Sequence, residues 1–345
     1  MRVLVIKTSS MGDVIHALPA LTDAKRERPA ITFDWVVEEA FTEIPRWHPA
    51  VDQVIPVAIR RWRKNIFNIL GSNEWRQFKT QLRKQHYDLV IDCQGLIKSA
   101  WIGRLVKAPV AGMDKHSARE PIAAWFYRHK YSVDKNMHAI ERIRQLFADA
   151  LGYEKPKSRG DYGIDRQSFY GASLESANIV FLHATTRDDK LYPEAYWREL
   201  AKKLIADGYR IRLVWGEEHE HARALRIAEG IEGVEVLPRL NLHGVACVLA
   251  QASAVVAVDT GLGHLTAALN IPAISLYGPT NPDLVGAYGE NQFHICSASD
   301  QENKAESGSE TESAGLAKLE PDTIYDLLQR KILAQSETVV FQKLS

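Results

Sequence analysis

The sequence has few cysteines and no long apolar stretch. Its three cysteines, Cys93, Cys247 and Cys296, lie far apart, which excludes a disulfide framework and a thiolate metal site. No uninterrupted apolar run approaches the roughly 18 residues that a membrane-spanning helix requires. The opening residues, MRVLVIKTSS, lack the apolar core and cleavage site of a signal peptide. We therefore expect a water-soluble protein of the cytoplasm.

The composition is that of a folded protein. Hydrophobic residues make up 46% of the chain and charged residues 25%, a balance that excludes wholesale disorder. The chain has 345 residues, and since a domain takes about 150 residues we expect two domains.

Charge is balanced overall but unevenly distributed. Residues 1–150 contain 24 Lys and Arg against 16 Asp and Glu, which leaves 19 against 27 for the remainder. The basic first part indicates an anionic partner there, such as a phosphorylated substrate, a nucleic acid or an acidic membrane surface. No DNA-reading helix or zinc module is recognisable, so we expect no nucleic-acid partner.

Short β-branched runs alternate with helical patterns along the chain, which predicts parallel sheets flanked by helices and an α/β fold class. Two such series are present, as expected for two domains. The predicted strands are 3–7, 33–37, 89–92 and 110–112, followed by 179–183, 211–215, 234–237, 254–258 and 273–277.

A polar segment rich in Gly, Pro and Lys, residues 152–163, separates the two series and is typical of a linker. It predicts a first domain over 1–155 and a second over 164–315. The Ser- and Glu-rich stretch 297–315 contains no large apolar residue, and we expect a mobile loop there. Residues 316–345 follow as a C-terminal helix and tail, for which the first domain is a candidate packing partner.

Ligands of parallel sheets bind at the carboxyl ends of the strands, so the residues that follow each strand are the candidates. Asp13 follows the first strand and is a candidate base, although capping of the next helix explains it as well. Thr185, Thr186 and Lys190 follow the strand 179–183, where hydroxyls and a lysine can bind a diphosphate; a solvated turn is the alternative.

A third group, VDTGLGHLTAA at 258–268, predicts a helix N-terminus that binds phosphate. A dinucleotide fingerprint is disfavoured, because its third glycine is replaced by Thr266 and no acid ends a following strand about 20 residues on. The candidate residues are Asp259, Thr260, Gly261 and His264. A histidine packed within the helix is the alternative for His264.

Two further groups carry charge. Glu220 follows another predicted strand and can accept hydrogen bonds from a ribose, although an acidic turn explains it equally well. The histidines on either side of it do not have the spacing of a zinc site, and no Asp-x-Asp pair occurs in the candidate groups, so we expect no metal. The run Arg60, Arg61, Arg63 and Lys64, with Arg119 as a further candidate, suits phosphate and carboxylate recognition; a solvated helix face is the alternative.

Six motifs together resemble the heptosyltransferase I family of lipopolysaccharide biosynthesis, over nearly the whole chain. They are VLVIKTSSMGDVIHALPAL, AIRRWRK, DCQGLIKSA, FLHATTRDDK, VDTGLGHLTAAL and LYGPTNP. The resemblance implies two facing Rossmann-like domains, the GT-B glycosyltransferase architecture, with the acceptor on the first and ADP-heptose on the second. It implies inverting transfer of L-glycero-D-manno-heptose from ADP-heptose to Kdo of Kdo2-lipid A, with no cofactor.

The resemblance also implies roles for the candidates. Asp13 would be the general base, and the run from Arg60 to Lys64 would meet the anionic acceptor. Thr185, Thr186 and Lys190 would hold the diphosphate, Glu220 the ribose, and Asp259, Thr260, Gly261 and His264 the rest of the donor. Members usually have a serine at the position of Gly263. The protein would lie peripherally on the anionic cytoplasmic face of the inner membrane.

Two alternatives remain open. One is the sister enzyme that adds the second heptose, although the motifs AIRRWRK and TRDDK favour the enzyme that adds the first. The other is a non-catalytic protein that binds an ADP-nucleotide; Asp13 argues against it, because a pure binder needs no base.

Overall fold

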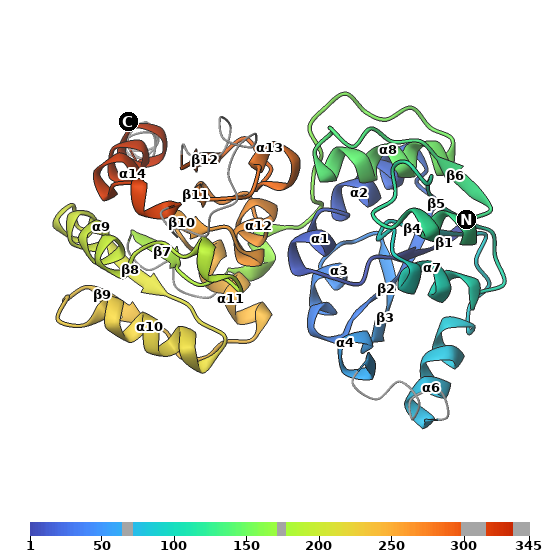
Figure 1. Ribbon diagram of the computed structural model, residues 1–345, viewed down its shortest axis with the longest axis horizontal. Helices are drawn as coiled ribbons and strands as arrows, with labels where there is room; N and C mark the ends of the chain where they lie inside the picture. The colour runs from blue at the N-terminus through green and yellow to red at the C-terminus, as the bar shows by residue number, and fades with distance from the viewer. Residues whose placement is uncertain (64–71, 171–176, 298–314, 334–345) are drawn as a thin grey trace, which may run out of the picture. The chain divides into compact units, whose positions relative to one another are not determined.

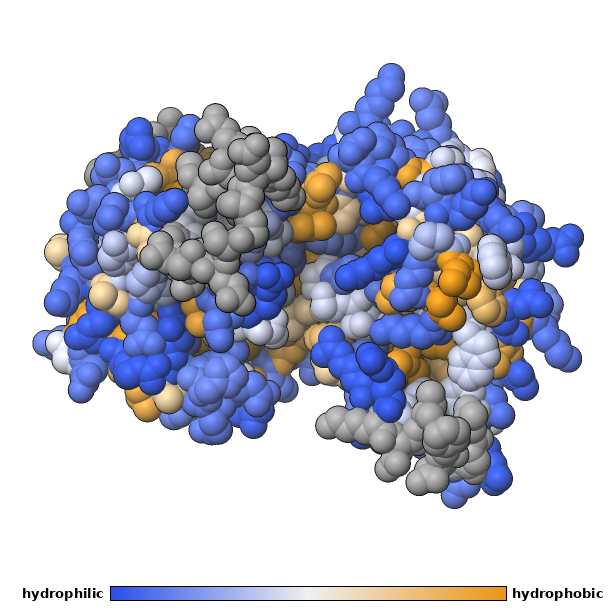
Figure 2. All heavy atoms as spheres, viewed as in Figure 1, coloured by the Kyte–Doolittle hydropathy of each residue, from blue (hydrophilic) through white to orange (hydrophobic). Residues whose placement is uncertain are grey.

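The computed structural model describes residues 1–63, 72–170, 177–297 and 315–333. The chain divides into two compact units, Met1–Ile164 and Asp165–Ser345, and each contains a six-stranded sheet (Figure 1). Most of the surface in Figure 2 is hydrophilic, and apolar residues reach it in small groups. Within the described ranges, no helix combines the length and the apolar character needed to cross a membrane.

The sheet of the first domain has the strand order β3-β2-β1-β4-β5-β6 with all neighbours parallel. This is the order of a doubly wound fold, in which the chain reverses direction across the sheet beside β1. The central strand β1 consists of an apolar run that is buried along nearly its whole length. The strands are β1 (Arg2–Ile6), β2 (Thr32–Glu38), β3 (Val51–Val57), β4 (Leu89–Asp92), β5 (Val110–Met113) and β6 (His129–Tyr131).

Helices connect these strands and cover the sheet. They are α1 (Met11–Ile15), α2 (Leu18–Glu27), η1 (Glu39–Phe41), α3 (Glu43–Arg46), α4 (Ile59–Trp62), α6 (Asn73–Leu82), α7 (Ile97–Arg104), η3 (Pro121–Phe126) and α8 (Ala139–Leu151).

The second domain repeats the same topology. Its parallel sheet has the order β12-β11-β10-β7-β8-β9, which is the order of the first sheet read from the other edge. The strands are β7 (Asn178–Leu182), β8 (Arg210–Leu213), β9 (Val234–Val236), β10 (Ala254–Val258), β11 (Ala273–Tyr277) and β12 (Gln292–Cys296). The predicted α/β fold of two Rossmann-like domains is therefore confirmed.

The helical segments of this domain vary in length. They are η4 (Arg166–Phe169), η5 (Asp188–Lys190), α9 (Glu194–Ala206), α10 (Glu218–Ala228), α11 (Leu242–Ala250), α12 (Gly261–Ala268), α13 (Pro282–Val285), η6 (Leu316–Lys318), α14 (Pro321–Leu328) and the π-helical turn η7 (Gln329–Leu333).

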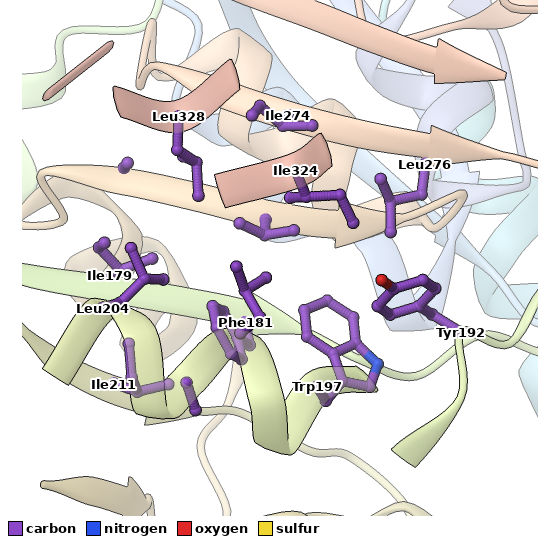
Figure 3. Packing of buried hydrophobic residues seen from close by; sticks show 14 of the residues in the cluster. Ile179, Phe181, Tyr192, Trp197, Leu204, Ile211, Ile274, Leu276, Ile324 and Leu328 are labelled. Carbon is purple, nitrogen blue, oxygen red and sulfur yellow. The ribbon is translucent and has the colours of Figure 1, made fainter. Parts of the chain in front are cut away.

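The C-terminal helix packs on the second domain. Ile324 and Leu328 of α14 are buried in the same core as Phe181 and Trp197, and α14 packs against α9 (Figure 3). The hydroxyl of Tyr192 also donates a hydrogen bond to the Leu319 carbonyl at 2.7 Å. The first domain was the candidate packing partner, but for residues 315–333 the apolar face of this helix completes the core of the second domain instead. The tail 334–345 lies outside the described residues.

The predicted linker belongs structurally to the first domain. Lys155 Nζ lies 2.6 Å from a carboxylate oxygen of Glu141, and Arg26 pairs with Asp161 at 2.5 Å. The buried Arg144 also donates a hydrogen bond to the Pro156 carbonyl at 3.2 Å. A polar composition predicted a free linker, but these polar groups instead attach the segment to α2 and α8. Nearly all of the predicted loop 297–315 lies outside the described residues.

Candidate functional site

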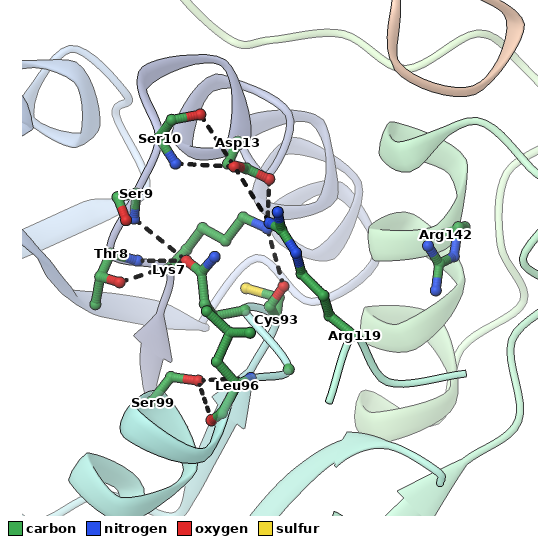
Figure 4. Close-up of polar contacts among 12 residues, drawn as sticks. Lys7, Thr8, Ser9, Ser10, Asp13, Cys93, Leu96, Ser99, Arg119 and Arg142 are labelled. Atoms are coloured by element: carbon green, nitrogen blue, oxygen red, sulfur yellow. Dashed lines mark hydrogen bonds and ion pairs between the residues drawn. The ribbon is translucent and has the colours of Figure 1, made fainter. Parts of the chain in front are cut away.

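Asp13 lies at the carboxyl edge of the first sheet, in the short helix α1 that follows β1. One oxygen, Oδ2, accepts hydrogen bonds from the Ser10 backbone N–H at 2.8 Å and the Ser10 hydroxyl at 3.1 Å (Figure 4). The side chain remains 29% exposed. Asp13 therefore caps its own helix and at the same time presents a carboxylate to solvent, while its role as a base stays a prediction.

Two cations face this carboxylate. The buried Lys7 places Nζ 3.3 Å from Asp13 Oδ1, and the exposed Arg119 places a guanidinium nitrogen 4.0 Å from Oδ2. Burial raises the pKa of Asp13, but Lys7, the Ser10 N–H and Arg119 outweigh it and hold that pKa below its usual value. The carboxylate is thus ionised at neutral pH, and the adjacent guanidinium can attract an anion.

The loop after β4 supports this arrangement from the neighbouring strand. Gln94 Oε1 accepts hydrogen bonds from the backbone N–H groups of Thr8 at 2.9 Å and Ser9 at 3.2 Å. The fully buried Asp92 accepts bonds from the Gln94 N–H at 2.9 Å and the Tyr127 hydroxyl at 2.7 Å, and burial raises its pKa. These bonds tie the loops after β1 and β4 together beneath Asp13.

The arginines of the basic run differ in their surroundings. Arg61 forms salt bridges with Glu39 at 3.1 Å and with Glu74, so its donors are already occupied. Arg60 lies over the Phe41 ring, with 5.3 Å from its guanidinium carbon to the ring centroid, and Arg63 is exposed just after α4. Lys64 lies outside the described residues.

In the second domain, Asp259 accepts hydrogen bonds from three side chains. Lys190 Nζ donates to Asp259 Oδ2 at 2.5 Å, and the Thr280 hydroxyl donates to the same oxygen at 2.6 Å. The Thr185 hydroxyl donates to the Asp259 backbone carbonyl at 2.9 Å, whereas Thr186 is exposed. The loops after β7, β10 and β11 thus meet at one edge, with a lysine held among them.

Helix α12 begins immediately beside this lysine. Thr260 is its N-cap residue, in an extended conformation and without a capping bond from its side chain, and Gly261 is its first helical residue. His264 is buried one turn further on. A Cβ added at Gly263 would meet its nearest atoms at 3.7 to 4.0 Å, an ordinary contact distance, so the backbone leaves room for the Cβ of a serine.

Glu220 is part of a turn. Its Oε2 accepts hydrogen bonds from the backbone N–H groups of Gly216 at 2.7 Å and Glu217 at 3.1 Å, at the start of α10. The structure thus gives Glu220 a capping role after β8, while its proposed contact with a ribose stays a prediction. Across the described parts of the chain, no group of three or more His, Cys, Asp or Glu side chains is arranged to hold a metal ion.

The sequence did not mark Lys7, Gln94 and Thr280 as site residues. Lys7 follows directly on the apolar run of β1, and Gln94 and Thr280 lie in motifs that drew attention only as a whole. The position of Lys7 at the end of a buried central strand could have identified it as a site residue, because a buried lysine needs a carboxylate partner.

Comparison with known proteins identifies the family. Residues 75–314 match glycosyltransferase family 9 (heptosyltransferase). The chain belongs to this family. It is 60% identical over 296 residues to lipopolysaccharide heptosyltransferase 1 of Pseudomonas aeruginosa, covering 86% of this chain and 83% of that protein.

Two solved structures of the E. coli heptosyltransferase WaaC are similar to the whole chain. The complex with ADP has a TM-score of 0.87 at 50% identity and covers 96% of this chain and 100% of that one. The complex with ADP-2-deoxy-2-fluoro heptose has a TM-score of 0.84 at 50% identity, covering 95% and 99%. This chain is accordingly a glycosyltransferase of the heptosyltransferase family.

Proposed function

We propose that this heptosyltransferase transfers L-glycero-D-manno-heptose from ADP-heptose to a Kdo residue of Kdo2-lipid A. The observation that carries the proposal is the likeness along nearly the full chain to proteins named lipopolysaccharide heptosyltransferase 1. The structures of WaaC with ADP and with a fluorinated ADP-heptose support ADP-heptose as donor.

The first domain provides the acceptor chemistry in this proposal. Asp13 accepts the proton of the attacking Kdo hydroxyl while the hydroxyl oxygen forms its bond to the anomeric carbon. Its pKa is held below the usual value, which keeps it ready to accept a proton but makes it a weak base. The exposed cations Arg119, Arg60 and Arg63, together with Lys64, attract the carboxylates and phosphates of the acceptor.

The second domain provides the donor chemistry. As the bond between the anomeric carbon and the diphosphate oxygen breaks, ADP leaves with the electron pair and the configuration inverts. Lys190 and the start of α12 supply the positive charge that this leaving group requires, with Thr185 and Thr186 on the same loop as Lys190. In the proposal, Glu220 serves the ribose, Asp259, Thr260, Gly261 and His264 contact the rest of the donor, and no metal or other cofactor takes part.

The acceptor is a lipid, so the proposal places the protein peripherally on the cytoplasmic face of the inner membrane. Transfer to an acceptor that already carries the first heptose would instead indicate the sister activity, and ADP-heptose binding without transfer would indicate a binding protein.

The test measures ADP release with ADP-heptose and one of three acceptors: none, Kdo2-lipid A, or the heptosylated lipid. Release that depends on Kdo2-lipid A supports the proposal. Asp13→Asn should bind ADP as the parent does and lower turnover by at least about 100-fold. Asp283→Asn, at an exposed aspartate of the second domain, is the matched control. If Asp13→Asn turned over as fast as the parent, Asp13 would be excluded as the general base. Full inhibition by a chelator, reversed by Mg²⁺, would contradict metal-free transfer.

A further inference from the structure

An apolar face lies on the first domain where α7 and η3 pack against each other. It consists of Ile97, Trp101, Ile122 and Trp125, which are 40%, 41%, 48% and 77% exposed. Half of the exposed large hydrophobic side chains in the described residues belong to this one face. Single apolar residues scattered on a surface are ordinary, whereas a cluster of them marks a binding surface.

The local sequence produces this exposure. Ile97 and Trp101 are four residues apart in α7 and therefore share one side of the helix. Ile122 and Trp125 are three residues apart in the 3-10 helix η3, where that spacing also places side chains on one side. The opposite sides face the interior: Ala100 and Ile102 of α7 and Ala123 and Ala124 of η3 are buried. The face is therefore anchored to the core: the Trp101 ring stacks on the buried Trp75 ring at 5.3 Å between centroids, while Trp125 remains largely exposed.

Cations surround the apolar face. Residues 97–130 contain seven Lys and Arg but only two acids. Both acids are engaged: Asp114 accepts the Ser117 N–H at 2.8 Å, and Glu120 accepts the Ile97 N–H at 2.7 Å. The exposed cations of the segment are Arg104, Lys107, Lys115, Arg119, Arg128 and Lys130. Figure 2 shows apolar residues among hydrophilic ones on the surface where Figure 1 draws α7.

Tryptophan and isoleucine among lysines and arginines match the boundary of an anionic bilayer. The indole ring prefers the headgroup level, aliphatic side chains enter the acyl region just below, and basic residues are attracted to anionic lipids. Each basic residue near an anionic surface adds to the attraction, so the one-sided charge favours a bilayer over a protein partner.

We propose that the apolar face and its exposed cations dock the first domain on an anionic phospholipid bilayer, with Trp125 and Ile122 inserted at headgroup level. The inference rests on the proposed function for the reason to be at a membrane, and it names the surface that makes the contact. Arg119 lies two residues before η3, and its guanidinium nitrogen is 4.0 Å from a carboxylate oxygen of Asp13. Docking through this face therefore brings Asp13 close to a lipid-borne acceptor.

The test is co-sedimentation with vesicles of phosphatidylethanolamine and phosphatidylglycerol, with phosphatidylcholine vesicles for comparison. The double variant Trp125→Ser, Ile122→Ser should lower the partition coefficient for anionic vesicles by at least about tenfold, since each large apolar side chain contributes strongly to insertion. Trp125→Phe with Ile122→Leu should restore binding. Leu225→Ser, at a side chain 51% exposed in the second domain, is the matched control and should bind as the parent does.

A charge variant and a soluble substrate complete the test. Arg104→Gln with Lys107→Gln should weaken binding to anionic vesicles, and added salt should have the same effect on the parent. With a deacylated, water-soluble Kdo acceptor, the double variant and the parent should turn over equally. If the parent fails to transfer to any acceptor, the proposed function is wrong, while the vesicle result stands by itself.

Three outcomes would overturn the docking surface. The first is parent-like vesicle binding by the double variant with unchanged thermal unfolding. The second is loss of binding only when Arg60 and Arg63 are replaced, which would move the surface to α4. The third is a parent dimer, seen by light scattering, that the double variant dissociates without any change in vesicle binding; the face would then be covered by a second copy of the chain.

Discussion

Lys7 and Asp13 form an ion pair at the carboxyl edge of the first sheet, with 3.3 Å between Nζ and Oδ1. The same ammonium donates a hydrogen bond to the Cys93 carbonyl at 3.1 Å. Because Lys7 is buried and held from two sides, its charge has a fixed position relative to the carboxylate. We therefore assign it the role of positioning Asp13 and holding its pKa down.

Replacing Lys7 by Met should raise the pKa of Asp13, because the largest influence that lowers it is removed while burial remains. The acidic limb of the kcat/KM profile should then move to higher pH. The measurement is the pH profile of transfer for the parent, Lys7→Met and the control Lys202→Met, which changes an exposed lysine of α9. An acidic limb that stays in place would show that Lys7 is only structural.

Lys190 should matter more for turnover than for binding. Negative charge on the departing diphosphate is greatest in the transition state, so Lys190→Ala should lower kcat by at least about 100-fold and weaken ADP binding less. Asp259→Asn keeps this lysine but removes the negative charge that holds it at 2.5 Å. Its kcat should therefore lie between those of the parent and of Lys190→Ala. Calorimetry with ADP and steady-state kinetics separate the two effects, with Lys202→Ala as control. Equal losses in binding and turnover would make Lys190 an anchor instead.

The arginines of α4 and its C-terminal end should not behave alike. Arg63→Gln should raise KM for the lipid acceptor, because it removes an exposed positive charge. Arg61→Gln should mainly lower the melting temperature, since Glu39 and Glu74 would lose their shared partner. Acceptor kinetics and thermal unfolding of the two variants decide this. The opposite pattern would mean that the Arg61 pairs open when the acceptor binds.

His48 should make the first domain sensitive to acid. Its Nδ1 accepts the Ala50 N–H at 3.1 Å, and its Nε2 lies 2.9 Å from the Thr22 hydroxyl oxygen. Burial lowers the pKa of His48 from 6.5 to about 4. Between these values the unfolded chain binds a proton that the folded chain does not, so stability falls as pH falls through this window.

The loss of stability linked to His48 should be on the order of 3 kcal/mol at pH 4 relative to pH 7. Urea unfolding at several pH values measures it, with His48→Gln as the comparison. The variant should be less stable at pH 7 but should lose less stability on acidification. A parallel pH dependence in both proteins would exclude His48 as the group responsible.

Gly263→Ser should be tolerated. The nearest atoms to an added Cβ lie at 3.7 to 4.0 Å, and serine is a better helix former than glycine by a few tenths of a kcal/mol. Thermal unfolding should show an equal or slightly higher midpoint, and the affinity for ADP should not decrease. A lowered midpoint would indicate that α12 requires a residue without a side chain at position 263.

The sequence predicted the central strands of both sheets and the edge strand β9, but not the other three edge strands, β3, β6 and β12. Central parallel strands are buried on both faces and appear as continuous apolar runs. An edge strand is half solvated: β3 contains Pro56 and alternates between buried and more exposed residues, and β6 is only three residues long. Such segments resemble loops when the neighbouring strand is unknown.

The candidate site was predicted in part for a similar reason. Parallel topology alone indicates which loops gather at the carboxyl edge, and Asp13, Lys190 and Asp259 were found in this way. The pairing of Lys190 with Asp259, and of Thr280 with the same carboxylate, joins loops that are distant in sequence. Such pairings depend on strand order and register, which composition and local pattern do not contain.

The position of α14 determines the order in which the chain can fold during synthesis. The first domain takes all its strands and helices from residues before 165, so it can complete its core while the ribosome is still translating the remainder. The second domain lacks one side of its core until Leu316, Ile324 and Leu328 have emerged. Its sheet therefore keeps an uncovered apolar surface through most of its synthesis, and a ribosome that stops before residue 316 releases a finished first domain joined to an incomplete, aggregation-prone second one.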